Sequence, residues 1–309
     1  MSEIFLASSS FGHYSFRPKN ILEEYNFTLR GNSLGRKLLP EEIVELAYNA
    51  DGIIAGTESY SEDVINKLPN LKVISRLGVG LDNIDLKIAD EKGIKVFITN
   101  SPAPAVAELI LGLMLDIKRR ISNQNQNLKE GKWEKKMGSL LQGNTLGIIG
   151  LGTVGKALIR LVQGFDFIVL AYDQVKDEKF QREYNVQYTE LNTLLKESDI
   201  VSLNINLTDQ TKYLINKTRL KLMKSDSVLI NTSRGEIVDE LALYTALKNG
   251  KLAGAGLDVF EQEPYSGLLT ELENVVLTPH IGSYAKEVRV QMEIEAAQNL
   301  IKGLLIEEK

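Results

Sequence analysis

Short apolar segments rich in β-branched residues alternate with helical segments along nearly all of this 309-residue chain. In the first hundred residues the strand-like segments are 3–8, 25–30, 51–56, 71–78 and 94–99. Segments with helical spacing of apolar residues and acidic first turns lie between them, at 39–49, 61–68 and 83–93. Strands that alternate with helices of this length form parallel sheets covered on both faces, so we predict an α/β fold of doubly wound sheets.

A second alternating series begins near Asn144. Its strand-like segments are 145–150, 167–173, 199–205, 227–233, 254–260 and 274–280, and the helices between them include 154–164 and 240–250. A helix from about Ala103 is predicted to run on through the polar tract 119–131, and the long amphipathic helix 283–305 is expected to pack back on the first unit. The chain is therefore predicted to form two α/β units joined near residue 100.

The charge pattern and the apolar segments exclude several classes of partner. The formal net charge is -5, from 36 basic and 41 acidic residues without a block of like charge, so nucleic acid is not an expected partner. No basic leader precedes an apolar run near the N-terminus. The longest apolar segment, 105–117, is interrupted by Glu108 and Asp116 and falls short of the roughly 20 residues that span a bilayer. We expect a cytoplasmic protein with no membrane partner.

The chain has no cysteine and only two histidines, His13 and His280. Disulfides, thiolate catalysis and cysteine-ligated metal are therefore excluded. No cluster of the remaining ligand-type residues has metal-ligand spacing, so no metal is predicted.

Three glycines, Gly150, Gly152 and Gly155, form a G-x-G-x-x-G pattern between an apolar strand and a helix. In a dinucleotide-binding turn the first glycine allows the sharp bend, the second leaves room for pyrophosphate, and the third lets helix and strand approach closely. Amide groups at the helix N-terminus then face the phosphates. The alternative is a tight turn without a ligand.

Asp173 ends the strand that follows this turn, where a carboxylate suits the two ribose hydroxyls of an adenine nucleotide. A carboxylate there also repels the additional phosphate of NADP, and no arginine stands at Gln174 or Val175 to offset it. NAD is therefore the predicted cofactor, with Lys176 as the residue that argues against this choice. A strand-end turn residue is the alternative interpretation of Asp173.

Three charged or titratable residues follow strands of the second series: Arg234, Glu263 and His280. Ligands of doubly wound sheets lie beyond the carboxyl ends of the strands, so these side chains are candidates for a catalytic site. A histidine, with an ordinary pKa of about 6.5, can act as base in alcohol oxidation and as acid in the reverse reduction. A carboxylate would orient it, and an arginine would anchor a substrate carboxylate. A surface ion pair for Arg234 and a solvated turn for Glu263 are the alternatives.

At these residues the sequence resembles the D-isomer-specific 2-hydroxyacid dehydrogenase family. The matching stretches are, in order, SRLGVGLDNIDL (75–86), VAELILGLML (106–115), GNTLGIIGLGTVGKAL (143–158), NTSRGEIVDE (231–240), AGLDVFEQEP (255–264) and LTPHIGS (277–283). The resemblance implies that Arg234 binds the substrate carboxylate and carbonyl, that His280 is the general acid/base, and that Glu263 is its partner. Formate dehydrogenases of this superfamily have glutamine at the position of Glu263, so that branch is not expected.

The resemblance also implies ligand-binding residues around the cofactor and the substrate. Thr153 and Val154, with the glycines, would contact the pyrophosphate. Thr232 and Asp258 would lie on the nicotinamide side, and Asp173 would hold the ribose. The backbone around Val79 and Gly80 would hold the substrate carboxylate.

The family architecture implies a Rossmann cofactor domain, residues 99–283, inserted into a flavodoxin-like substrate domain formed by residues 1–98 and 284–309. It further implies closure of the cleft when ligands bind, and a homodimer through the helix beginning near Ala105. One departure is the stretch NSPAPAVAE, which is about three residues shorter than the family's usual loop.

Arg76 resembles the phosphoglycerate dehydrogenase branch, in which an arginine at this position faces the substrate phosphate. The alternative is an arginine that braces its loop. The leading hypothesis is NAD-dependent oxidation of a D-2-hydroxy acid, with 3-phosphoglycerate as the favoured substrate, or the reverse reduction. A glyoxylate or hydroxypyruvate reductase with the same site is the alternative enzyme. An NAD-sensing binding protein, similar to the C-terminal-binding corepressors, is the alternative of a different class.

Overall fold

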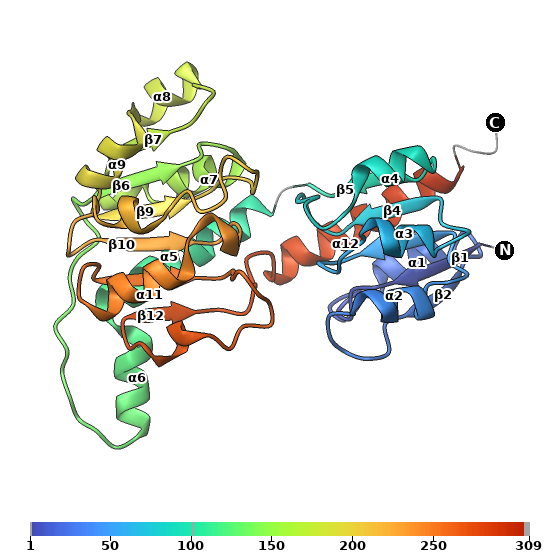
Figure 1. Ribbon diagram of the computed structural model, residues 1–309, viewed down its shortest axis with the longest axis horizontal. Coiled ribbons are helices and arrows are strands. Elements are labelled where there is room, and N and C mark those ends of the chain that lie inside the picture. The colour runs from blue at the N-terminus through green and yellow to red at the C-terminus, as the bar shows by residue number, and fades with distance from the viewer. Residues whose placement is uncertain (1, 101, 306–309) are drawn as a thin grey trace. The chain divides into compact units, whose positions relative to one another are not determined.

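A computed structural model describes residues 2–100 and 102–305 and divides the chain into two compact units (Figure 1). Unit 1 contains the chain up to Pro102 together with the segment from Tyr284 onward, and unit 2 contains Ala103–Ser283. The division lies a few residues after the boundary expected between residues 98 and 99. Each unit has its own parallel sheet.

The sheet of unit 1 has five parallel strands in the order β2-β1-β3-β4-β5. The strands are β1 (Glu3–Leu6), β2 (Thr28–Gly31), β3 (Gly52–Ala55), β4 (Val73–Arg76) and β5 (Lys95–Ile98). This is the flavodoxin-like order, in which the direction of strand addition across the sheet reverses between β1 and β3. In the pairing of β3 with β4, Ala55 lies opposite Arg76, so the two strands end at the same level of the sheet.

Helices α1 (Arg17–Glu23), α2 (Pro40–Leu46), α3 (Glu62–Asn66), α4 (Leu86–Glu91) and α12 (Lys286–Leu305) cover this sheet. The long helix α12 packs on β3, β4 and β5, so this helix belongs to unit 1 although it follows unit 2 in the sequence. Leu300 is fully buried there, and a side chain at Gly303 would meet Val73 at 2.8 Å. Helix α1 is not among the predicted helices, because its N-terminus has neither a side-chain cap nor an acidic residue in the first turn.

A buried ion pair ties α12 to the loop after β1. Arg289 and Glu293 are 5% and 0% exposed and lie 3.1 Å apart, Nε to Oε1. Arg289 also donates to the hydroxyls of Ser8 at 2.8 Å and Ser10 at 3.0 Å, and the Gly12 N–H donates to Glu293 at 3.0 Å. Burial raises the pKa of the Glu293 carboxyl, whereas the Gly12 N–H and Arg289 oppose that rise.

The sheet of unit 2 has seven parallel strands in the order β12-β11-β10-β9-β6-β7-β8. They are β6 (Thr145–Ile149), β7 (Ile168–Tyr172), β8 (Gln187–Tyr188), β9 (Ile200–Leu203), β10 (Val228–Asn231), β11 (Gly254–Leu257) and β12 (Val275–Leu277). The order reverses beside β6, as in a Rossmann fold. Six of these strands fall within predicted segments, whereas the two-residue strand β8 is too short to give a periodic signal.

The helices of unit 2 are α5 (Ala103–Arg119), α6 (Ile121–Lys129), α7 (Thr153–Leu161), α8 (Glu178–Tyr184), α9 (Leu191–Glu197), α10 (Lys217–Leu220) and α11 (Glu240–Lys248). Short 3-10 turns are η1 (Gln163–Phe165), η2 (Gly235–Ile237) and η3 (Leu268–Glu271). Helix α5 packs on α7 and on strands β10, β11 and β12.

The expectation that the helix from Ala103 continues through residues 119–131 is wrong. Arg120 has a φ of 55°, in the left-handed region, and separates α5 from α6. The Asp116 carboxylate accepts hydrogen bonds from the N–H and the hydroxyl of Ser122, which satisfies the start of the new helix. Helix α6 buries no residue, so no apolar face holds it in line with α5.

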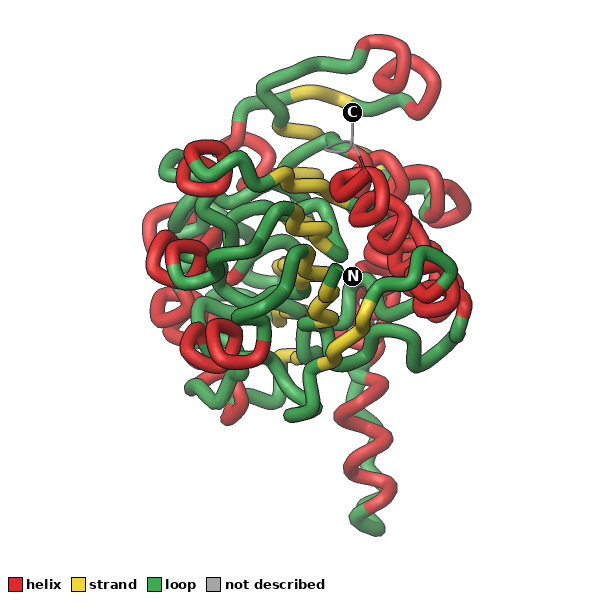
Figure 2. The backbone as a smooth tube through the Cα atoms, turned by 90° about the vertical axis from the view of Figure 1, so that its right-hand side faces the viewer, coloured by secondary structure: helices red, strands yellow, loops and turns green. Residues whose placement is uncertain are grey.

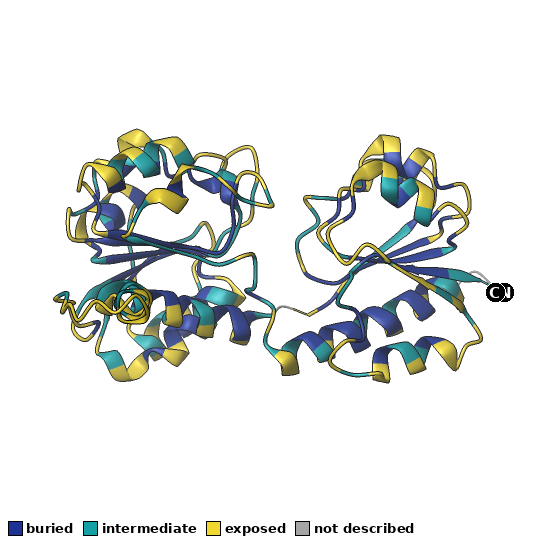
Figure 3. Ribbon diagram, turned by 90° about the horizontal axis from the view of Figure 1, so that it is seen from below, coloured by how far each residue is buried: buried dark blue, intermediate teal, exposed yellow. Residues whose placement is uncertain are grey.

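In each unit the buried residues are concentrated in the sheet and on the helix faces that cover it (Figure 3). The predicted architecture of two doubly wound parallel sheets is therefore confirmed. Among residues 2–100 and 102–305, no helix combines the length and apolar character needed to cross a membrane.

Candidate active site

Arg234, Glu263 and His280 follow the three neighbouring strands β10, β11 and β12 of unit 2. Because parallel strands end at the same edge of a sheet, all three chains leave the sheet on one side. Arg234 comes three residues after the end of β10, and His280 comes three residues after the end of β12. The structure thus has these three residues after neighbouring strands, as the sequence predicts.

His280 and Glu263 form a direct pair. The Nδ1 atom of His280 lies 2.9 Å from Oε2 and 3.2 Å from Oε1 of Glu263. The two side chains are 35% and 23% exposed, so the pair is partly shielded and still reachable. An ionised carboxylate only accepts hydrogen bonds, so Nδ1 is the donor and Nε2 is the nitrogen available for proton exchange.

The backbone at His280 is held in a left-handed conformation, with a φ of 55°. The buried carboxylate of Asp258 stabilises this turn. It accepts the Thr278 hydroxyl at 2.5 Å and the N–H groups of Ile281 and Gly282, each at 2.8 Å. Burial raises the pKa of the Asp258 carboxyl, and these donors and the nearby His280 oppose that rise. Asp258 is 1% exposed, and the hydrogen bonds of its carboxylate go to the turn that carries His280.

Arg234 lies on a turn that neighbouring backbones fix. Asn231 accepts the Ser233 N–H at 3.1 Å and donates to the Arg234 carbonyl at 2.8 Å. The next residue, Gly235, is so close to the chain after β11 that a Cβ would lie 1.9 Å from the Phe260 carbonyl carbon. A residue with a side chain does not fit at Gly235, so the turn that carries Arg234 is rigid.

The glycine turn has the geometry of a dinucleotide site. Gly150 has a φ of 92°, and a Cβ there would lie 2.4 Å from the Asn204 carbonyl oxygen. A Cβ on Gly155 would lie 2.5 Å from the Gly150 carbonyl oxygen, whereas nothing lies within 4 Å of a Cβ on Gly152. Gly152 caps α7 and borders open space, which leaves room for a pyrophosphate at the helix N-terminus.

Thr153, at the start of α7, is exposed, and Val154 beside it is half-buried. Thr232, after β10, is also half-buried. Their expected contacts with pyrophosphate and nicotinamide remain predictions.

Asp173 lies at the end of β7 and is tied to the glycine turn. Its Oδ2 accepts the Leu151 N–H at 2.7 Å, and its Oδ1 accepts the Val175 N–H at 2.9 Å. A carboxylate has about four acceptor positions, so capacity for ribose hydroxyls remains. The ammonium group of Lys176 lies over the Tyr188 ring, 5.9 Å from its centroid, rather than on Asp173.

In unit 1, Arg76, Val79 and Gly80 lie at and after the end of β4. Val79 is 44% exposed, whereas Arg76 is 6% exposed and donates to the carbonyl oxygen of Leu77. The structure therefore shows Val79 at the surface and gives Arg76 the kind of contact that the bracing interpretation requires.

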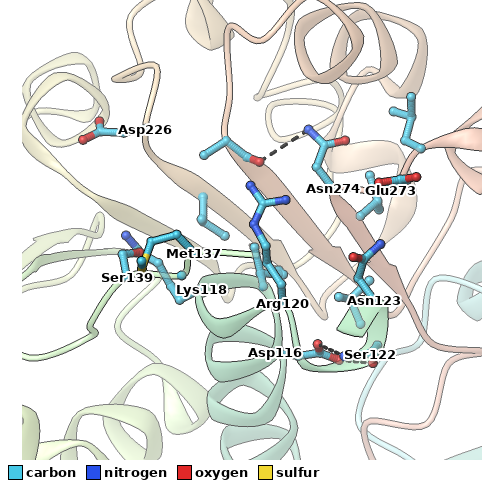
Figure 4. Close-up of a pocket in the computed structure, with 17 residues that line it drawn as sticks. Asp116, Lys118, Arg120, Ser122, Asn123, Met137, Ser139, Asp226, Glu273 and Asn274 are labelled. Atoms are coloured by element: carbon cyan, nitrogen blue, oxygen red, sulfur yellow. Dashed lines mark hydrogen bonds between the residues drawn. The ribbon is translucent and has the colours of Figure 1, made fainter. Parts of the chain in front are cut away.

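A cavity of about 400 Å³ in unit 2 lies elsewhere (Figure 4). It is lined by Lys118, Arg120 and Met137 and by residues at the amino ends of β10 and β12, among them Asp226 and Asn274. The candidate catalytic residues Arg234, Glu263 and His280 instead follow the carboxyl ends of β10, β11 and β12. Within the described residues, no group of three or more histidine, aspartate or glutamate side chains is placed to hold a metal ion.

Sequence reasoning missed the roles of Asn231 and Gly235 and the function of Asp258 in holding the His280 turn. The first two lie within the quoted stretch NTSRGEIVDE, but a close backbone approach has no signal of its own in one sequence. The resemblance implies a place for Asp258 on the nicotinamide side, whereas its contact with Gly282 is visible only in the fold.

Comparison with known proteins identifies related chains over most of the length. The family model described as D-isomer specific 2-hydroxyacid dehydrogenase, NAD binding domain, matches residues 111–282. A hydroxypyruvate reductase of Thermotoga maritima is 43% identical over 275 residues, which is 87% of each chain. A glyoxylate reductase of Korarchaeum cryptofilum is 40% identical over 271 residues, covering 84% of this chain and 81% of the relative.

Two further similarities bear on substrate and cofactor. A D-3-phosphoglycerate dehydrogenase of Methanocaldococcus jannaschii is 38% identical over 276 residues, which is 86% of this chain and 52% of the relative. The crystal structure of a D-lactate dehydrogenase from Aquifex aeolicus complexed with NAD and lactic acid superposes with a TM-score of 0.84. It is 30% identical and covers 99% of this chain and 96% of that chain.

We expect Gly152→Ala to fold normally and to weaken binding of NADH by about 10- to 100-fold, because the new methyl group occupies only the space left for pyrophosphate. Fluorescence titration with NADH measures the affinity, and thermal unfolding checks the fold. Gly164→Ala is the matched control, since nothing lies within 4 Å of a Cβ there either. Unchanged NADH affinity in Gly152→Ala would place the cofactor elsewhere.

Proposed function

The chain belongs to the D-isomer-specific 2-hydroxyacid dehydrogenase family and is an NAD-dependent dehydrogenase, and from that premise we propose that it reduces glyoxylate or hydroxypyruvate. The observation that carries the proposal is the His280–Glu263 pair at the strand ends of unit 2. The same unit contains the glycine turn with open space at Gly152.

His280 is proposed to move the proton in this reaction. During reduction its Nε2–H donates a proton to the carbonyl oxygen of the oxo acid, and during oxidation the neutral ring removes the hydroxyl proton. Glu263 holds Nδ1–H and stabilises the charged ring before the proton leaves. Asp258 fixes the turn, so that the ring is already oriented when substrate arrives.

Arg234 is proposed to bind the substrate carboxylate and carbonyl through its planar guanidinium. The N–H groups around Val79 and Gly80, in unit 1, are proposed to hold the same carboxylate. NAD, when bound through Gly150, Gly152 and Asp173, supplies or accepts the hydride. Unit 2 would thus be the cofactor domain and unit 1 the substrate domain.

The choice of substrate differs from the leading hypothesis drawn from the sequence. The relatives described above with 43% and 40% identity are reductases of hydroxypyruvate and glyoxylate, whereas the phosphoglycerate enzyme is 38% identical over about half of its own length. The buried position of Arg76 supports the same preference. We therefore favour an unphosphorylated oxo acid over 3-phosphoglycerate.

We expect the purified protein to oxidise NADH with glyoxylate or hydroxypyruvate, with a kcat/KM at least about tenfold higher than with 3-phosphohydroxypyruvate. The loss of nicotinamide absorbance at 340 nm measures each rate, and NADPH is tested beside NADH. A preference for the phosphorylated acid would support the phosphoglycerate hypothesis instead.

We expect His280→Gln to keep its NADH affinity and to lose about 100- to 10,000-fold in kcat, because the amide cannot exchange the proton. Near-normal turnover by His280→Gln would remove His280 from the mechanism.

We further propose that the chain forms a homodimer through α5 and the α6 arm, which we define as residues 121–140. The arm stands away from the body of unit 2 (Figure 2). Its exposed large apolar side chains are Ile121, Leu128, Trp133, Met137 and Leu140. Trp133 and Met137 are 81% and 92% exposed, a degree of exposure that favours burial against a second copy.

We expect sedimentation velocity to show a dimer and Trp133→Glu to shift it toward monomer, because a charge would then be buried in the interface. Tyr48→Glu, a similar exchange of a 53% exposed aromatic in unit 1, is the control and should leave the dimer intact. A monomer without any substitution would contradict the proposal.

A further inference from the structure

A tight backbone contact joins the turn that carries Arg234 to the turn that carries Glu263. A Cβ on Gly235, the residue after Arg234, would lie 1.9 Å from the Phe260 carbonyl carbon and 2.3 Å from the Glu261 nitrogen. The peptide between Phe260 and Glu261 is therefore packed directly on the Arg234 turn, and Glu263 follows it two residues later. The spacing of the two turns thus depends on how this peptide is held.

The side chains of Glu261 and Glu240 hold the peptide through a reciprocal pair of hydrogen bonds. The Glu261 N–H donates to Oε1 of Glu240 at 2.6 Å, and the Glu240 N–H donates to Oε1 of Glu261 at 3.2 Å. Glu240 is the first residue of α11, where backbone N–H groups have no partner within the helix. The Asp239 carboxylate accepts the Ala242 N–H at 2.9 Å, and Glu261 satisfies the N–H of Glu240. The start of α11 and the turn after β11 are therefore joined through both main chains.

Tyr213, in the loop after β9, provides a second donor to the Glu261 carboxylate. Its hydroxyl donates to Oε2 of Glu261 at 3.1 Å. The Tyr213 N–H donates to the Glu236 carbonyl at 2.7 Å, so this residue is also tied to the segment after β10. Glu261 belongs to the turn after β11 and accepts hydrogen bonds from the segments that follow β9 and β10. One side chain therefore connects the segments after three neighbouring strands.

The turn from Phe260 to Tyr265 links Glu261 to the proton-transfer pair. The Phe260 N–H donates to Oε1 of Glu263 at 3.3 Å, and the rings of Phe260 and Tyr265 are stacked with their centroids 4.1 Å apart. The Glu263 carboxylate is thus bound by its own turn at the same time as it accepts from Nδ1 of His280. A displacement of the turn would displace this carboxylate with it.

We propose that Glu261 is a positioning residue, whose carboxylate fixes the spacing between the Arg234 turn and the turn that carries Glu263. The inference rests on the proposed function, in which Arg234 anchors the oxo acid and His280 moves the proton. Proton transfer needs the carbonyl oxygen within hydrogen-bond distance of Nε2, and a misplacement of about 1 Å can cost about 100-fold in rate. Glu261 acts on this distance through the backbone and does not touch the reacting groups.

The contacts of Glu261 predict which substitution is tolerated. A glutamine keeps both of them, because its amide oxygen accepts the Glu240 N–H and its amide nitrogen donates to the Tyr213 oxygen. An alanine removes both. A geometric role therefore predicts that Glu261→Gln behaves as the wild type and that Glu261→Ala is impaired, whereas a role of the charge predicts equal impairment.

The first measurement is the steady-state reduction of glyoxylate and hydroxypyruvate with NADH. We expect Glu261→Ala to lose about tenfold or more in kcat and to keep its KM for NADH within about threefold, because the glycine turn lies elsewhere in unit 2. We expect Glu261→Gln to keep kcat within about threefold. Gln262→Ala is the matched control, because its side chain is exposed in the same turn, and it should leave both constants unchanged.

The second measurement reports on the His280 ring without any substrate. The chain has only His13 and His280, so isotope-labelled histidine gives nitrogen NMR signals from two rings, which His280→Gln assigns. In the neutral ring of the wild type we expect the proton on Nδ1, because Glu263 accepts from that atom. We expect Glu261→Ala to shift the tautomer population toward Nε2–H, since the Glu263 carboxylate is no longer held. A change in overall stability alone would not move this population.

Tyr213→Phe remains informative if Glu261→Ala does not fold, because it removes one donor and keeps the ring. We expect it to lower kcat about threefold and to shift the tautomer in the same direction. If Glu261→Ala does not fold, an unchanged Tyr213→Phe would overturn the inference.

An unchanged kcat or an unchanged tautomer in folded Glu261→Ala would overturn the inference, as would equal losses in Glu261→Gln and Glu261→Ala. Wild-type protein inactive on both acids would reject the proposed function and this inference together. An active wild type with a normal Glu261→Ala would reject the inference alone.

Discussion

The proposed catalytic geometry depends on the hydrogen bonds that the buried Asp258 carboxylate accepts. This carboxylate receives a hydroxyl and two backbone N–H groups from Thr278, Ile281 and Gly282, which surround His280 in sequence. A histidine with a φ of 55° would otherwise be a strained residue in a mobile turn. Three donors compensate the burial of the charge, and the His280 ring is thereby presented to Glu263.

Unit 1 connects two of its loops with different groups. There the Asn83 side-chain amide, in the loop after β4, donates to the Gly56 and Glu58 carbonyls in the loop after β3, whereas in unit 2 the Asp258 carboxylate accepts N–H groups from the chain after β12. In both sheets the loops at the carboxyl edge carry the proposed ligand groups, while buried polar side chains beneath them set the backbone. Rigid loops reduce the entropy lost when substrate binds, which favours turnover of small acids with few contacts to offer.

Much of the fold and the identity of the three candidate catalytic residues could be predicted, because both depend on local patterns. Strand periodicity placed β6, β10 and β12, and strand ends led to Arg234 and His280. What could not be predicted depends on tertiary contacts. The break at Arg120 follows from the absence of a buried face on α6, and the contacts of Arg76 depend on a neighbouring backbone at Gly78. The expected phosphate role of Arg76 came from resemblance, which does not report burial.

The return of the chain to unit 1 in α12 imposes an order on folding during synthesis. Unit 2 is one continuous segment, so all of its strands are available as soon as residue 283 has emerged. Unit 1 lacks the helix that covers β3, β4 and β5 until α12 has been synthesised after unit 2, and contacts such as that from Ser75 to Ala296 span 221 residues. The strands of unit 1 are therefore synthesised before unit 2, but the helix that covers them is synthesised after it. In the interval the uncovered apolar face of the sheet can associate with other nascent chains.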